Sequence, residues 1–177
     1  MKRFAASLAA ACLIAGAPAW AGEDAQLMIE FSGPPQVNST YDELTEEETF
    51  VGHYSGTVSD TPENLLVGAE VNCEFDGYAA PGRAFSCGFT TVEQVSGRCL
   101  FTAEGGDTAV AEWSCRTGAM MTSDARCEGR AKWIEGTGKF AGITGDARFH
   151  SDLFLQPGKG FAKWRGEWRI PSLAMAR

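Results

Sequence analysis

The chain has 177 residues, and 15 basic against 23 acidic side chains give it a net charge of −8. A hydrophobic fraction of 44%, with 11% aromatic residues, excludes a disordered chain and is sufficient for one domain with a real core. The acidic balance argues against nucleic acid as a partner. Because His53 and His150 are the only histidines, we expect neither a histidine-built metal site nor another cofactor.

Residues 1–21 have the pattern of a secretory signal peptide. Lys2 and Arg3 precede an apolar stretch at 4–17, and Ala19-Trp20-Ala21 forms a small-x-small cleavage signal. The apolar stretch is shorter than the ~20 residues that a membrane-spanning helix needs. We therefore predict a secreted or periplasmic single domain at 22–177 with a net charge of −10 and no membrane span after signal removal.

Signal removal leaves five cysteines, which are Cys73, Cys87, Cys99, Cys115 and Cys127. In an oxidising compartment we expect two disulfides and one free thiol. The candidate pairs join adjacent strands and are Cys73–Cys87 with either Cys99–Cys115 or Cys115–Cys127. The absence of any Cys-x-x-Cys pair argues against zinc.

Alternating polarity between glycine-rich breaks predicts strands with one wet face. The pattern is clearest at 124–133 and recurs at 69–77 and 160–170. Further strands are expected at 26–31, 49–59, 84–95, 98–103, 108–116 and 146–155. Such strands fit a closed antiparallel barrel or a sandwich.

Small residues beside large aromatics on the inward faces favour a barrel over a sandwich. We predict an all-β, calycin-like closed barrel of eight or nearly eight antiparallel strands. An outer-membrane barrel is a rival, but its lipid-facing positions would favour bulkier groups than the glycine and alanine found here.

The segment at 133–149 contains Gly136-Thr137-Gly138-Lys139-Phe140-Ala141-Gly142-Ile143-Thr144-Gly145. It resembles the Gly-Thr-Gly-x-Phe-x-Gly-x-x-Gly connection of the allene oxide cyclase and dirigent-like barrels. Glycines here would let the chain turn through positive φ and place Phe140 under the barrel end as a plug. The resemblance implies an eight-stranded barrel with an apolar cavity, whose plant members cyclise an epoxide or steer radical coupling. No family catalytic residue has a counterpart in this sequence.

The inward face supplies the candidate ligand site, because an apolar cavity with a few polar groups is the usual small-molecule site. We predict that a small, largely apolar ligand binds inside the barrel. The candidate binding residues are Tyr54, Phe75, Phe89, Trp113, Trp133, Phe149, Ser151, Trp164 and Trp168.

Two alternative functions remain open. A cyclase or isomerase would need an inward carboxylate, for which Glu48 and Glu93 are the candidates. A non-catalytic structural or interaction barrel with a solid interior would instead present an acidic loop at 43–48 or a basic stripe. The stripe would form if the strands are neighbours, from Arg130, Lys132, Lys163, Arg165 and Arg169.

The sequence favours a solvent-exposed His150 over a catalytic one. Arg148, His150 and Asp152 share one face of a predicted strand, where Asp152 could orient His150 as a base. We expect this face to be the solvated outer one. The sequence does not indicate catalytic residues or an oligomeric state, and the interior ligand is favoured over an enzyme.

Overall fold

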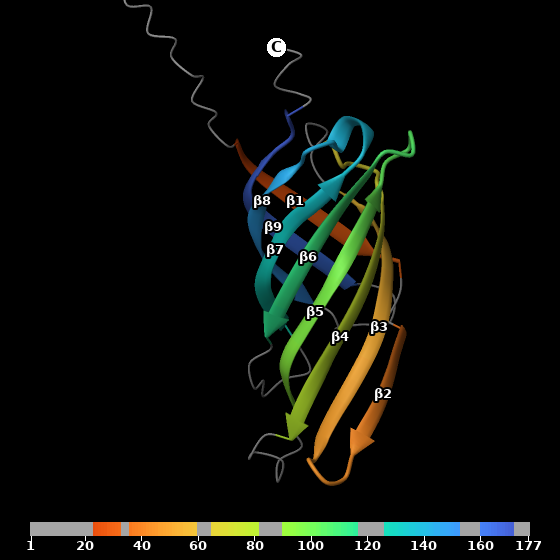
Figure 1. Cartoon of the computed structure of the whole chain (residues 1–177), viewed down its shortest axis with the longest axis vertical. Coiled ribbons are helices and arrows are strands. Elements are labelled where there is room, and N and C mark those ends of the chain that lie inside the picture. Colours follow the sequence, from red (N-terminus) through yellow and green to blue (C-terminus); the bar gives the residue numbers. More distant parts are fainter. Residues whose placement is uncertain are drawn as a thin grey trace, which may run out of the picture.

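The computed structural model describes residues 23–32, 36–59, 65–81, 90–116, 126–152 and 160–171. Nine antiparallel strands and one short 3-10 helix occur in these ranges (Figure 1). They are β1 (Glu23–Phe31), β2 (Gln36–Asp42), β3 (Glu47–Val58), β4 (Glu70–Pro81), β5 (Thr90–Thr102), β6 (Thr108–Arg116), β7 (Arg126–Gly136), η2 (Gly138–Phe140), β8 (Thr144–Asp152) and β9 (Gly160–Arg169). The predicted all-β barrel is confirmed.

Eight strands close the barrel, and β2 is added at the end of the sheet. The strand order is β1-β9-β8-β7-β6-β5-β4-β3-β2, and an additional β1–β3 pairing joins the ends of the eight-stranded part. β1 pairs with β9 along its whole length but meets β3 only through Ile29–Phe31. The first half of β3 pairs with β2 instead. In Figure 1 the β2–β3 hairpin therefore lies at one end of the long axis, away from β1 and β8.

Two of the strand predictions need correction. The predicted strands at 84–95 and 98–103 are not separate, because β5 runs without a break from Thr90 to Thr102. Gly97 is not a turn residue; a Cβ at this position would collide with the Glu74 backbone and lie 2.9 Å from the Trp113 ring. β2 was not predicted, since all seven of its side chains are exposed and show no alternation. Residues 84–89 of the predicted strand lie outside the described residues.

Aromatic rings pack against one another through the barrel interior. One series of neighbouring centroids runs Phe31–Tyr54 at 4.7 Å, Tyr54–Phe75 at 5.0 Å, Phe75–Trp113 at 6.3 Å, Trp113–Phe149 at 5.7 Å and Phe149–Trp164 at 5.8 Å. Trp133 extends it by contacting both Trp164 and Trp168. Separations of this size are favourable for aromatic pairs, so these contacts add to the burial of apolar area.

The connection from β7 to β8 has the structure that its glycines predict. Gly138, Gly142 and Gly145 have φ values of 51°, 75° and 132°, which favour glycine over other residues. Phe140 lies in η2 with 0% of its side chain exposed. The predicted burial of Phe140 in this connection is thus confirmed.

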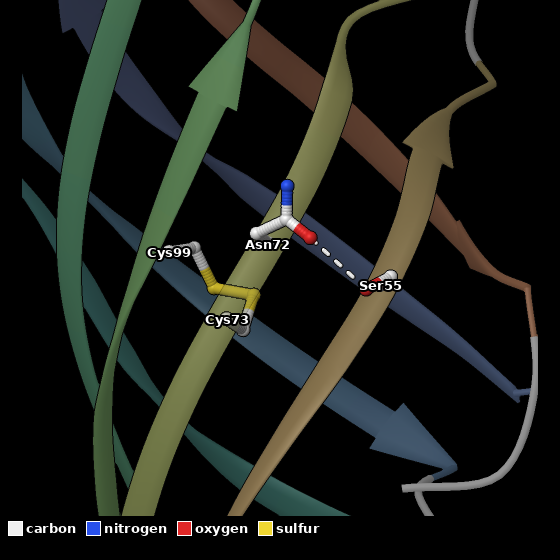
Figure 2. Close-up of a disulfide and its surroundings, with 4 residues drawn as sticks. All are labelled: Ser55, Asn72, Cys73 and Cys99. Carbon is white, nitrogen blue, oxygen red and sulfur yellow. Dashed lines mark hydrogen bonds between the residues drawn. A yellow bond between two sulfur atoms is a disulfide. The ribbon is translucent and has the colours of Figure 1, made fainter.

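Two disulfides join neighbouring strands. Cys73 of β4 is bonded to Cys99 of β5, directly opposite in the ladder (Figure 2), and Cys115 of β6 is bonded to Cys127 of β7. The predicted Cys115–Cys127 pair is present, whereas the Cys73–Cys87 and Cys99–Cys115 pairs are wrong. Cross-strand register decides the partner, because a disulfide needs closely spaced Cα atoms, and short spacing in sequence does not provide them. Cys87 lies outside the described residues.

Candidate functional site

The structure brings most of the predicted ligand-binding residues together inside the barrel. Trp168 is partly buried and packs against the core, and Phe89 lies outside the described residues. The buried members are Tyr54, Phe75, Trp113, Trp133, Phe149, Ser151 and Trp164. Most of the aromatic members contact one another through the ring pairs given above, so they form a packed aromatic cluster.

Two buried donors in this cluster have no hydrogen-bond partner among the described residues. They are Tyr54 Oη and Trp113 Nε1. Both rings pack against Phe75, with centroid distances of 5.0 Å from Tyr54 and 6.3 Å from Trp113. Burial raises the pKa of the Tyr54 phenol well above its usual range. The phenol therefore remains protonated and can donate a hydrogen bond, but it is not a base at neutral pH.

The other inward polar residues offer little acid–base chemistry. The Ser151 hydroxyl donates to the Phe161 carbonyl oxygen at 3.1 Å. Glu48 is half-buried near the start of β3. Glu93 is the unpaired residue of a β-bulge next to the Tyr78–Gln94 pair. The structure does not describe its side chain. Among the described side chains there is no buried carboxylate, and no cluster of three or more metal-ligating residues was found.

An open groove of about 860 Å³ crosses the outer face of the sheet from β2 to β8. A second groove of about 480 Å³ shares Asn38, Val51, Asp76 and Ser96 with it and continues toward the β2–β3 hairpin. One row of directly opposite residues crosses the first groove and consists of His53, Glu74, Arg98, Glu112, Lys132 and Asp146. From Glu74 to Asp146 the charges alternate in sign, and Arg98 Nε donates to Glu112 at 3.0 Å.

The next row on β7, β8 and β9 has a different charge pattern. Arg130 lies directly opposite Arg148, which lies directly opposite Arg165, and all three side chains are exposed. Arg165 also donates to Gln26 Oε1 at 3.1 Å. We call Arg130, Arg148 and Arg165 the arginine row. Arg130 lines the larger groove, so the row begins in that groove and continues beyond it around the barrel.

The arginine row bears on two sequence-based interpretations. The two strands of the predicted basic stripe, β7 and β9, are not neighbours, because β8 lies between them. Arg148 of β8 instead stands directly opposite both Arg130 of β7 and Arg165 of β9. Sequence reasoning assigned Arg148 to a possible catalytic set with His150 and therefore missed its place in the row. His150 is exposed between Glu128 and Lys163 on the outer face. This position agrees with the expected solvated face.

Within the described residues, no helix is both long enough and apolar enough to cross a membrane. No family model matches the chain, and the search of curated proteins found no match.

Proposed function

We propose that this protein is an exported barrel that binds an anionic group of a partner on the outer face of β7, β8 and β9. The arginine row is the observation that carries this proposal. The bound group would be a phosphate, sulfate or carboxylate, because the planar guanidinium matches the oxygen pairs of these anions.

The charge pattern of the sheet supports an anionic partner. Like charges directly opposite each other destabilise a sheet, and the arginine row places two such pairs side by side. The neighbouring row alternates in charge from Glu74 to Asp146, and beyond Asp146 it continues into the acidic pair Asp146–Glu167. In a chain with a net charge of −8, three opposed arginines are a local exception, and an anion bound between them would relieve their repulsion.

Export is supported by the two disulfides between neighbouring strands, because such bonds persist in oxidising compartments. We therefore propose a location in the periplasm or outside the cell. A relationship to the allene oxide cyclase and dirigent-like barrels also remains a proposal. It is supported by the buried Phe140 and the positive φ values of Gly138, Gly142 and Gly145.

The test measures binding of the oxidised protein to a sulfated polysaccharide and to anionic lipid vesicles. We expect binding to at least one probe, and we expect it to weaken as NaCl rises from about 50 to about 200 mM. Arg148→Ala should weaken binding about tenfold, since a hydrogen bond to a charged group contributes roughly 1.5 kcal/mol or more.

Arg98→Ala is the matched control for this test. Arg98 is also an exposed arginine of the sheet, but it is already paired with Glu112. Its replacement should leave binding nearly unchanged. The proposal fails if neither probe binds at low salt, or if Arg148→Ala and Arg98→Ala weaken binding equally.

A small-molecule site in the interior is a second candidate, favoured by the two unpaired donors of Tyr54 and Trp113. A small apolar ligand with one acceptor could satisfy either donor, although it would have to displace part of the ring cluster around Phe75. Titration of a hydrophobic compound library should then quench tryptophan fluorescence saturably. Tyr54→Phe should weaken the response to the compound that binds best, and the absence of any saturable response would remove this candidate.

A further inference from the structure

We infer that two copies of this protein associate through β2, so that the two β2 strands pair antiparallel about a twofold axis at Ser39. β2 is the last strand of the sheet and pairs only with β3 (Figure 1). In the part of the chain that the structure describes, nothing pairs with its other edge. The backbone groups that alternate toward this edge are therefore free to bond to another strand.

The edge lacks the usual features that prevent strand pairing. Natural edge strands are blunted by lysine, proline or bulges, but β2 contains no lysine or proline. Its register with β3 runs without a shift from Gln36–His53 to Asp42–Glu47. Asp42, at the very end, is its only charged residue.

Apolar side chains are exposed along this edge. Val37 and Tyr41 are 43% and 58% exposed and lie on the same face of β2. Leu44, in the turn that follows, is 96% exposed. Exposed apolar groups that gather on an unpaired strand are typical of an association surface.

The sequence of β2 is self-complementary in one antiparallel register. When Ser39 faces its own copy, Val37 faces Tyr41 of the second copy, and Asn38 faces Thr40. Both apolar side chains then have apolar partners, and no like charges are opposed. Moving the axis to Thr40 would place Val37 opposite Glu43, and moving it to Asn38 would place Val37 opposite Ser39. The register about Ser39 is therefore favoured.

Pairing through β2 would also join the outer grooves of the two copies. Gln36 and Asn38 line the larger groove, and Asn38 and Thr40 line the smaller one, so both grooves reach the β2 strand. An isologous pair would place these two β2 strands side by side in a continuous sheet. The dimer would then present one polar surface that extends across both barrels.

The register can be tested by a charge swap. Val37→Glu and Tyr41→Lys should each raise the dimer dissociation constant at least tenfold, because each places a charge opposite an apolar side chain. The double variant should recover most of this loss, since the two new side chains face each other across the axis. Sedimentation velocity over a range of concentrations measures the dissociation constant for each protein.

Val67→Glu is the matched control, because Val67 is 42% exposed and lies in a turn away from β2. It should leave the dissociation constant unchanged. Circular dichroism and thermal unfolding confirm that every variant folds. A wild-type protein that stays monomeric at several hundred micromolar overturns the inference, as does a double variant that dimerises no better than the single ones.

Discussion

Tyr54 places a phenol hydroxyl in an apolar interior where no acceptor from the described part of the chain lies within hydrogen-bonding distance. Its neighbours are the rings of Phe31 and Phe75, which offer no conventional acceptor atom. A buried donor without a partner costs about 1–3 kcal/mol. This cost is unusual in a native interior, and it makes Tyr54 the residue whose replacement is most informative.

Tyr54→Phe should raise the free energy of unfolding by about 1 kcal/mol at pH 8, because it removes the unpaired hydroxyl and keeps the ring. It should also change the alkaline pH dependence. Burial raises the pKa of Tyr54 in the folded state, whereas the unfolded chain ionises near pH 10. The ionisation of Tyr54 therefore leaves stability unchanged below pH about 10 and lowers it as the pH rises further.

Denaturant unfolding at pH 8 and at pH 11 measures both effects. The wild type should lose more stability between these pH values than the Tyr54→Phe variant. Tyr41→Phe is the control, because Tyr41 is exposed and its hydroxyl reaches water. An equal alkaline loss in wild type and Tyr54→Phe would contradict the assignment.

The burial of single residues followed from the sequence, but their partners did not. Strand parity places Tyr54, Trp113 and Trp164 on the inward face, and all three are buried. Whether a buried donor finds an acceptor depends on side chains and backbone of several strands at once. The unpaired Tyr54 and Trp113 donors could not be read from any single strand pattern.

At the scale of elements, the disulfides connect strands that neighbour each other both in the sheet and in the chain. Cys73–Cys99 closes a loop with a sequence separation of 26, and Cys115–Cys127 closes one of 12. In the chain-entropy model these loops correspond to roughly 3.5 and roughly 3 kcal/mol of stability. The two bonds are thus comparable in effect, with the longer loop contributing slightly more.

Replacement of both Cys73 and Cys99 by alanine should lower the free energy of unfolding by about 3.5 kcal/mol. Replacement of both Cys115 and Cys127 should lower it by about 3 kcal/mol. Changing both partners of a pair leaves no new thiol that could react with Cys87. Guanidinium denaturation without reductant measures the difference, and a variant as stable as the wild type would show that its bond adds nothing to the native state.

Strand prediction succeeded where one face is wet and the other is buried. β7, β9 and the first part of β4 have this alternation, because they cover the core with one parity and meet solvent with the other. β2 is exposed on both faces and therefore has no such signal. The predicted break between 95 and 98 does not occur, because Gly97 lies inside β5, where it admits the Glu74 backbone and the Trp113 ring.

The whole molecule combines a closed barrel with a hairpin that extends past the closure. This shape arises because the first half of β3 pairs with β2 and its last residues pair with β1. No local sequence pattern predicts these two pairings. The sequence predicted a barrel with inward aromatics, but it did not predict whether the rings would leave a cavity or meet. Ring contacts depend on the radius and register of the closed sheet, and these are properties of all eight strands together.

The arginine row also exists only at the scale of the whole barrel. Arg130, Arg148 and Arg165 are separated in sequence, and each belongs to a different strand. The strands that carry these arginines were predicted, but the register that places the three side chains opposite each other was not. A one-residue shift between β8 and β9 would have moved Arg165 off the outer face.

The position of Cys87 between the partners of the first disulfide has a consequence for how the protein matures. If the protein is exported from its N-terminus, as we propose, Cys73 and Cys87 reach the oxidising compartment before Cys99 emerges. The first bond available is therefore Cys73–Cys87, which the folded barrel does not contain. Reaching the native pairing from that bond requires thiol–disulfide exchange, in which the Cys99 thiolate attacks the Cys73 sulfur and releases Cys87. A Cys73–Cys87 bond formed during export would therefore have to rearrange before the barrel reaches its native pairing.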